Sequence, residues 1–326
     1  MNNRNKRRKK RKIFKMINLM LLLACIIGLS AIVYLYKSHS KISISQLSQA
    51  IPKISLFSKT DKKPAPKPSK KATNKEASHT NSQQQKGAVT WTKQQNPVKL
   101  PILMYHAIHV MAPEEAASAN LIVAPDLFES QLKTMKEAGY YFLSPEEAYR
   151  VLSANELPAE KVVWLTFDDS MVDFYNVDFY NVAFPILKKY DIKATNNVIT
   201  GFTEAGNAAN LTLDQMKEMK QAGMSFQDHT VNHPDLSQAS AASQTAEMKD
   251  SKEYLDRELH QDTIAIAYPA GRYTDTTLKI AEDLHYKLGV TTNEGLASAA
   301  NGLLSLNRIR ILPTTTADIL MNTISQ

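Results

Sequence analysis

The chain has 326 residues, a formal net charge of +7 and one cysteine, so it is long enough for a large core and contains no internal disulfide. Residues 1–36 carry nine Lys and Arg and no acid, residues 37–98 carry twelve Lys and two acids, and residues 99–326 carry eighteen Lys and Arg and thirty acids. Because the part that can form a core is acidic, the basic isoelectric point does not indicate a nucleic-acid partner.

The N-terminal segment predicts a single membrane anchor. A basic block over residues 1–16 precedes an uncharged run of about 20 residues over 17–36, long enough to cross a bilayer as a helix with the N-terminus in the cytoplasm. A cleaved signal peptide is the alternative, because Leu22-Leu23-Ala24-Cys25 loosely resembles a lipoprotein cleavage box. The apolar run continues for eleven residues beyond Cys25, which favours the uncleaved anchor. We therefore expect a cell-membrane protein whose remaining chain is extracytoplasmic.

The following segment, residues 37–97, is rich in Lys, Pro, Ser and Gln and has too few apolar residues to build a core. This composition predicts an extended, disordered linker. A solvated spacer is the favoured interpretation, and specific binding of an anionic wall polymer by its lysines is the alternative.

From residue 98 to residue 326, apolar segments of strand length alternate with amphipathic helical patterns. Regular alternation of strand and helix implies a parallel sheet, and about seven such units in about 230 residues favour a barrel over two small domains. The predicted strands span 100–105, 162–167, 194–199, 224–228, 263–268, 287–292 and 306–312, and the predicted helices span 124–138, 179–190, 212–222, 241–259 and 274–285.

The predicted strand at 162–167 ends in two adjacent carboxylates, Asp168 and Asp169. The carboxyl ends of parallel barrel strands form the active face, so both acids are expected at its rim. Because adjacent residues on an extended strand point to opposite sides, one acid can serve a metal and the other a water or substrate. An acidic pair at a strand end is also an ordinary turn or helix cap, so the pair alone leaves both interpretations open.

Two histidines, His229 and His233, follow the predicted strand at 224–228. They can converge on one ion if the segment turns helically, and with one carboxylate they form a facial site that has open positions. The segment lacks the glutamate of the helical HExxH zinc motif, which argues against a metallopeptidase of that class. Their place about 60 residues after the acidic pair, in the same alternating domain, favours metal binding over a solvent-exposed pair.

Together, Thr166-Phe167-Asp168-Asp169 and His229-Thr230-Val231-Asn232-His233 resemble the first two motifs of the NodB-type polysaccharide deacetylases, carbohydrate esterase family four. The resemblance covers roughly residues 98–315. It implies a distorted (β/α)7-type barrel and removal of N-acetyl groups from a cell-envelope polysaccharide, either peptidoglycan or poly-N-acetylglucosamine. It further implies that Asp169, His229 and His233 bind a divalent metal, with zinc as the expected ion, and that Asp168 is the general base.

The segment Tyr268-Pro269-Ala270-Gly271 resembles the third motif of this family, which implies that the backbone N–H of Ala270 binds the oxyanion. The family has an arginine two positions before the proline, where this chain has Ala267, so the arginine partner of the base must come from elsewhere. Arg272, Arg308 and Arg310 are the candidates, and the sequence does not choose among them. Judged alone, the segment is nearly as typical of a plain turn.

The general acid is expected from a different part of the chain. The family usually takes it from a C-terminal histidine, and this chain has no histidine after residue 290. Residues 101–106 form an apolar segment that ends in His106 and resembles the start of the poly-N-acetylglucosamine deacetylase branch, where the motif order is permuted. His106 is therefore the candidate acid, and a buried structural histidine is the alternative.

Two further functions remain open from the sequence. A catalytically impaired glycan-binding protein is favoured by the missing arginine and by Ser170, which stands where the first motif of the family usually has glycine. The intact acids and histidines argue against it. An O-acetyl esterase would use the same residues. No protein partner is predicted.

Overall fold

The computed structural model describes residues 89–169, 179–206 and 210–325, which lie within one compact unit over residues 83–326. Its strands are β1 (Thr92–Lys93), β2 (Ile102–Tyr105), β3 (Ala107–Ile108), β4 (Ile122–Val123), β5 (Tyr141–Phe142), β6 (Glu156–Leu157), β7 (Val162–Phe167), β8 (Thr195–Val198), β9 (Ser225–Asp228), β10 (Ala265–Ala267), β11 (Leu288–Glu294) and β12 (Leu306–Arg310). Its helices are η2 (Pro113–Leu121), α2 (Pro125–Glu137), α3 (Pro145–Ala154), η3 (Phe179–Ala183), α4 (Phe184–Lys189), α5 (Thr200–Glu204), α6 (Leu213–Gln221), α7 (Ala241–Leu259), η4 (Pro269–Gly271), α8 (Asp275–Asp283), η5 (Ala299–Asn301) and α9 (Ala317–Ile324).

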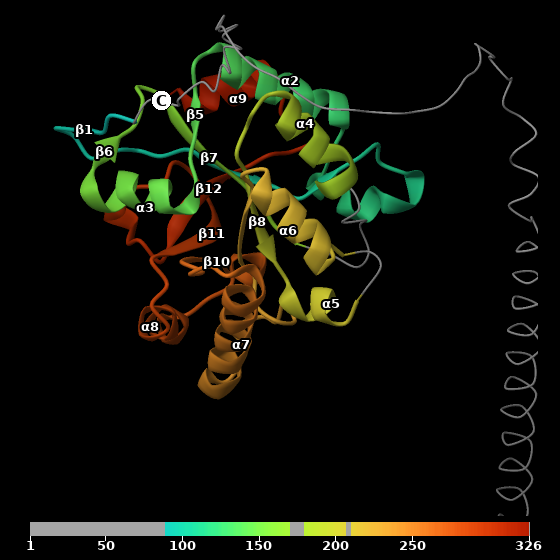
Figure 1. Ribbon diagram of the computed structural model, residues 1–326, viewed down its shortest axis with the longest axis vertical. Coiled ribbons are helices and arrows are strands. Elements are labelled where there is room, and N and C mark those ends of the chain that lie inside the picture. Colours follow the sequence, from blue (N-terminus) through green and yellow to red (C-terminus); the bar gives the residue numbers. More distant parts are fainter. Residues whose placement is uncertain (1–88, 170–178, 207–209, 326) are drawn as a thin grey trace, which may run out of the picture. The chain divides into compact units, whose positions relative to one another are not determined.

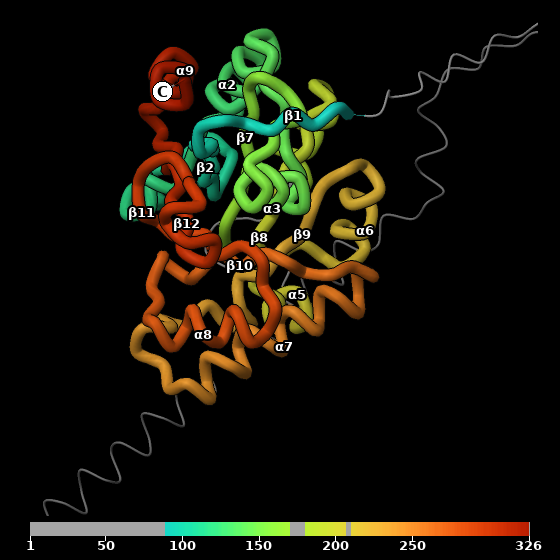
Figure 2. The backbone as a smooth tube through the Cα atoms, turned by 90° about the vertical axis from the view of Figure 1, so that its left-hand side faces the viewer, coloured from blue at the N-terminus to red at the C-terminus, as the bar shows by residue number. Residues whose placement is uncertain are grey.

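Seven parallel strands form the predicted barrel. From β7 to β12 each strand pairs with the next one in the chain, and β2 pairs with both β12 and β7, which closes the ring. Figure 1 shows these strands at the centre of the fold with helices around them. Helices α2 and α9 pack together at one end, and α7 and α8 pack together at the other, as Figure 2 also shows from the side.

All seven predicted strands and all five predicted helices are present; β7 and α7 have the predicted bounds, and the others differ at one or both ends by one or two residues. The predicted helix over 179–190 begins as the π-helix η3 before it continues as α4. The short strands add to the barrel: β5 pairs with the first residues of β7, while β1 pairs with β6 and β3 with β4 in two small sheets. Because β1 is part of this architecture, the folded unit includes residues before Val98.

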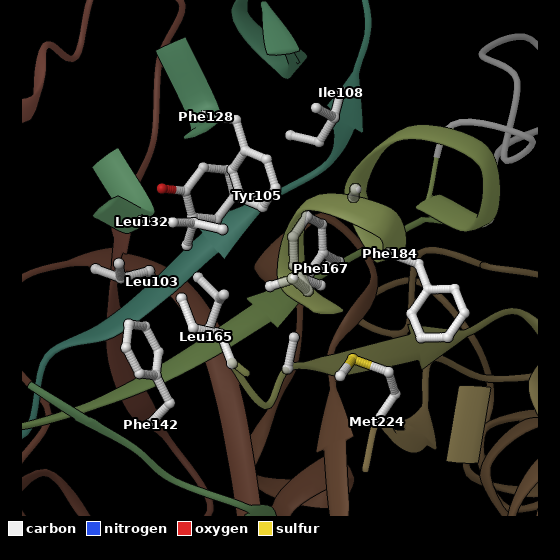
Figure 3. Close-up of a cluster of buried hydrophobic side chains, with 14 of the residues drawn as sticks. Leu103, Tyr105, Ile108, Phe128, Leu132, Phe142, Leu165, Phe167, Phe184 and Met224 are labelled. Carbon is white, nitrogen blue, oxygen red and sulfur yellow. The ribbon is translucent and has the colours of Figure 1, made fainter. Parts of the chain in front are cut away.

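Alternation along β7 determines which side chains reach the interior of the barrel. Val163, Leu165 and Phe167 face outward into the hydrophobic cluster that packs against α2. Figure 3 shows Phe167 in that cluster beside Tyr105 and Phe128, with ring centroids 5.3 to 5.8 Å apart. The intervening residues of β7 therefore point the other way, and Asp168 follows them into the mouth of the barrel.

No helix among the described residues is long and apolar enough to cross a membrane. The predicted span over 17–36 and the predicted linker over 37–97, except for its last nine residues, lie outside the part of the chain that the structure describes. Ser170 also lies outside it.

Candidate metal and catalytic centre

Three predicted metal ligands converge at the carboxyl end of the barrel. Asp169 follows β7, while His229 and His233 follow β9, and their ligand atoms all lie within 4.8 Å of one another. The Oδ1 atom of Asp169 is 2.9 Å from Nε2 of His229 and 3.1 Å from Nε2 of His233. Two imidazoles and one carboxylate in this arrangement suit a divalent transition metal and leave coordination positions open.

The surroundings of His229 also fit a metal ligand. Its Nδ1 atom is 2.6 Å from the carbonyl oxygen of Ala267 at the end of β10. A carbonyl can only accept, so Nδ1 carries the proton and Nε2 presents a lone pair toward Asp169 and His233. In the absence of metal, burial lowers the pKa of His229, but the contact with Asp169 together with the negative charges of Asp168 and Asp169 raises it above the usual value.

Left-handed backbone conformations bring these ligands together. Asp169, Thr230 and His233 have φ angles of 58°, 67° and 56°. The positive φ at Asp169 ends the alternation of β7, so that Asp168 and Asp169 serve the same mouth instead of the opposite sides expected for an extended strand. In the histidine loop, the N–H of His233 donates to Oγ1 of Thr230 at 3.0 Å, which holds the turn. Non-glycine residues in this region are strained and cluster at functional sites.

The carboxylate of Asp168 is held in place by a buried arginine and by an asparagine. Arg308 lies in β12 and is fully buried. Both of its terminal nitrogens donate to the carboxylate of Asp168, with Nη1 2.8 Å from Oδ1. Asn197 of β8 also donates to Oδ1, at 2.7 Å. Burial raises the pKa of Asp168, but the charge and hydrogen bonds of Arg308 outweigh it and hold the pKa below its usual range. Asp168 is therefore ionised and held in one orientation.

Arg308 is thus the candidate arginine that the structure places at the acid. Two of its other donors are also occupied, since Nε donates to the carbonyl of Thr291 at 2.8 Å and Nη1 donates to Thr166 at 3.2 Å. Arg272 instead forms an exposed ion pair with Asp235 at 2.6 Å. Arg310 ends β12 and is near enough to His106 for its charge to lower the pKa of that histidine.

His106 comes from the end of β2 and reaches the same centre. Its Nε2 atom lies 3.9 Å from Oδ2 of Asp169, and its Nδ1 atom is buried without a hydrogen-bond partner among the described residues. Burial lowers the pKa of His106, and the negative charges of Asp169 and Asp168 counteract this effect only in part. The position beside both acids fits a group that exchanges a proton with a bound substrate.

The third motif forms a tight turn after β10. Ala270 has a φ of 51°, and within the described residues no hydrogen bond engages its N–H. Gly271 follows with a φ of 68°, and a Cβ there would lie 2.1 Å from Oγ1 of Thr292, so only glycine fits. The turn therefore presents a backbone donor at the end of β10, next to the strand that bears His229.

Two buried contributors escaped the sequence reasoning. Asn197 lies within the predicted strand at 194–199, and nothing in the sequence linked it to Asp168. Asp228, directly before His229, is fully buried and accepts hydrogen bonds from the Thr230 N–H at 2.7 Å, from Ser251 at 2.5 Å and from Tyr286. The buried carboxyl group of Asp228 stabilises the loop beside the candidate ligand His229, and the presence of an acid next to the first histidine was the signal available in the sequence.

The chain resembles known polysaccharide deacetylases in sequence and in structure. The family model described as polysaccharide deacetylase matches residues 155–289. The protein YxkH of Bacillus subtilis strain 168, whose name places it among polysaccharide deacetylases, is 40% identical over 250 residues, which are 77% of this chain and 84% of that protein. The poly-β-1,6-N-acetyl-D-glucosamine N-deacetylase of Staphylococcus aureus is 32% identical over 187 residues, 54% of this chain and 62% of that protein.

Among solved structures, the deacetylase PplD of Streptococcus pyogenes, determined in complex with acetate, superposes with a TM-score of 0.67 and 76% sequence identity. The match covers 70% of this chain and 99% of the solved chain.

Proposed function

Because this chain belongs to the polysaccharide deacetylase family, we propose that it is a metal-dependent hydrolase that removes N-acetyl groups from N-acetylglucosamine-type units of a cell-envelope polysaccharide. The observation that carries this proposal is the convergence of an Asp-His-His ligand set, an arginine-held carboxylate and a histidine on one barrel mouth. Peptidoglycan and poly-N-acetylglucosamine are the two candidate polymers, and the staphylococcal relative is named for the second.

Asp169, His229 and His233 would hold the metal, and zinc is the ion that this donor set suits. A bound divalent ion acts as a Lewis acid and lowers the pKa of water toward neutrality. These residues fit such an ion because the three donor atoms lie close together and the carbonyl of Ala267 fixes the second ring nitrogen of His229.

In the proposed mechanism, Asp168 accepts a proton from the attacking water. Arg308 and Asn197 keep this carboxylate ionised and fix its direction, so the proton acceptor is ready before substrate binds. The N–H of Ala270 donates to the oxygen that becomes negative when the acetamide carbonyl is attacked. His106 then donates a proton to the departing amine. Burial lowers the pKa of His106, so its protonated imidazole gives up a proton readily, and the charges of Asp169 and Asp168 partly offset burial and help the ring to take up that proton beforehand.

An impaired glycan-binding protein is the alternative that rested on the missing arginine at the third motif and on Ser170. Arg308 supplies a guanidinium to Asp168 from β12, which argues against the first of these reasons, and Ser170 lies outside the described residues. An O-acetyl esterase would use the same groups, and no observation favours it over the amidase reaction.

The proposal includes a location. An anchor over residues 17–36 and a linker over residues 37–97 would place the enzyme outside the cytoplasmic membrane, close to its polymeric substrate. This part rests on the apolar run and the charge asymmetry of the sequence.

The test is acetate release from N-acetylglucosamine oligomers and from purified peptidoglycan, after chelation and after zinc is restored. Asp168→Asn should abolish release, whereas Asp283→Asn, which removes an exposed acid in the ion pair with Lys279, should leave it unchanged. Tight zinc binding without acetate release from either polymer would contradict the proposed reaction, and equal release before and after chelation would contradict its metal dependence.

A further inference from the structure

A cavity opens at the opposite end of the barrel from the candidate catalytic centre. It has a volume of about 790 Å³ and is lined by the segment that runs from β1 into β2, by the start of β7 and by the end of α9. The catalytic groups follow the carboxyl ends of β2 and β7, whereas this cavity lies at their amino ends. Six strand residues separate the two, a distance of roughly 20 Å.

One residue organises the wall of this cavity. Asn155 adopts a left-handed conformation after α3, and its side-chain amide donates to the carbonyls of Gln94 and Asn96, each at 3.0 Å. Its side-chain oxygen accepts from the N–H of Val98 at 2.8 Å. The segment 94–98 is therefore held in place by hydrogen bonds before any ligand arrives, and the side chains of Gln95 and Asn96 remain exposed at the cavity.

The cavity carries positive charge that carboxylates do not neutralise. Lys93, Lys99 and Lys161 line it, and Glu160 is the one acid among its lining residues. The ammonium of Lys93 donates to the carbonyl of Ala154 at 2.5 Å and that of Lys161 to the carbonyl of Ala138 at 3.2 Å. Neutral carbonyls orient these ammonium groups without cancelling their charge.

The cavity lies in an acidic domain. Residues 99–326 hold thirty acids against eighteen basic residues, and some exposed lysines, such as Lys133, Lys249 and Lys279, form ion pairs with acids one helical turn away. Among the described residues, none of the three cavity lysines forms an ion pair. A cavity lined by ammonium groups that form no ion pairs, in a domain with an excess of acids, favours binding of an anionic ligand.

We propose that this cavity is a second, non-catalytic site that binds an anionic envelope polymer of polyol or sugar units joined by phosphodiesters. The lysines would contact phosphate oxygens, for which ammonium groups are common ligands, while Gln95 and Asn96 would hydrogen-bond the hydroxyls between them. The aromatic residue of the lining, Tyr140, is buried and covered by Lys161, so the cavity offers no exposed ring on which a nucleic-acid base would stack. The choice of an envelope polymer rests on the proposed location, whereas the site itself does not depend on the catalytic centre.

Binding to this cavity would leave the catalytic mouth open. A wall-attached polymer held at the amino ends of the strands would keep the domain at the envelope while the opposite face acts on its own substrate. The effect would be an increased local concentration of enzyme, with no change in turnover of soluble substrates.

The test measures binding of the full chain to poly(glycerol phosphate) at several salt concentrations. The variant carries Lys93→Gln, Lys99→Gln and Lys161→Gln, and the matched control carries Lys133→Gln, Lys249→Gln and Lys279→Gln. Both retain every lysine before residue 93, so any background binding from that part cancels. We expect the cavity variant to bind roughly tenfold more weakly with a shallower salt dependence, and the control to bind like the parent.

Two further variants check the assignment. Replacement of the three cavity lysines by Arg preserves the charge and should restore binding. Gln95→Ala with Asn96→Ala should weaken binding of poly(glycerol phosphate) but not of inorganic polyphosphate, which has no hydroxyls. All variants should release acetate from soluble oligomers at the parental rate. Equal loss of binding in the cavity and control variants, or equally tight binding of a single-stranded oligonucleotide, would overturn the proposal.

Discussion

The buried carboxyl of Asp228 offers a direct test of how the histidine loop is stabilised. Burial raises its pKa from 3.8 to about 6, although hydrogen bonds from Ser251, Tyr286 and the Thr230 N–H favour the charged form. Tyr286 also lies 2.9 Å from the carbonyl of Met248 and has a single proton. When Asp228 is protonated at low pH, its hydroxyl can donate to Tyr286 in place of accepting from it, which frees the single proton of Tyr286 for Met248 and satisfies all of these groups.

A raised pKa means that Asp228 favours the folded state below pH 3.8 and loses that contribution as the pH rises through about 6. The gap between the folded and unfolded pKa corresponds to about 3 kcal/mol of lost stability by pH 7.5. Asn has the shape of the neutral acid, with an oxygen that accepts from Thr230 and Ser251 and an NH2 that donates to Tyr286. We therefore expect Asp228→Asn to gain stability relative to the parent, by about 2 to 3 kcal/mol, between pH 4 and pH 7.5.

The assay is urea unfolding of metal-free protein in a chelator at pH 4, 5.5 and 7.5, with Asp228→Leu as the control that removes every hydrogen bond. Effects of all other titrating groups are common to parent and variant and cancel in the difference. A difference between parent and Asp228→Asn that does not change with pH would refute the assigned protonation. A loss of more than 2 kcal/mol at pH 7.5, as large as that of the Leu variant, would refute the proposed hydrogen-bond pattern.

Three other changes test the centre. Arg308→Met should lower the free energy of unfolding by about 3 to 5 kcal/mol and acetate release at least about 100-fold, because it leaves Asp168 buried without its counter-charge; activity within twofold of the parent would contradict this role. His106→Gln should reduce turnover at least about 100-fold without changing zinc affinity measured by competition with a chelating dye, and weakened zinc binding would instead make His106 a ligand. Gly201→Ala places a Cβ 2.7 Å from the carbonyl of Val231 in the histidine loop. It should therefore lower the free energy of unfolding in urea by about 1 to 3 kcal/mol and weaken zinc binding. Parental values for both would show that the loop can move.

The barrel was predictable because its strands are buried on both faces. Such strands appear as short continuous apolar runs, and β7 and α7 have the bounds that the sequence indicated. The two-residue strands β1, β3, β4, β5 and β6 are too short for any periodicity, and only their tertiary pairing defines them. Helix α3 was missed although Ser144 and Glu147 form a capping box around Pro145, a local signal that was available.

The residues of the centre that belong to a short sequence motif could be predicted. Those that only the tertiary fold brings to the centre could not. Asp168, Asp169, His229 and His233 stand at strand ends in recognisable spacings, and the structure places all four at one mouth. Arg308 lies 140 residues after Asp168, and the sequence offered three arginines of equal merit. The choice among them requires the closure of the barrel, in which β12 and β7 both pair with β2.

The position of Arg308 also indicates what the site requires of an arginine. A buried carboxylate needs a fixed positive charge beside it and hydrogen-bond donors for its lone pairs. Any strand that ends at the same mouth of the barrel can provide a side chain that supplies both. The family expectation places this residue on the strand before the Tyr-Pro-Ala-Gly turn, where this chain has Ala267, whose carbonyl fixes His229. In this chain β12 provides the guanidinium, and Thr291 and Thr166 hold it in place. The absence of a motif residue therefore did not indicate a lost function, because the physical requirement is met from another strand.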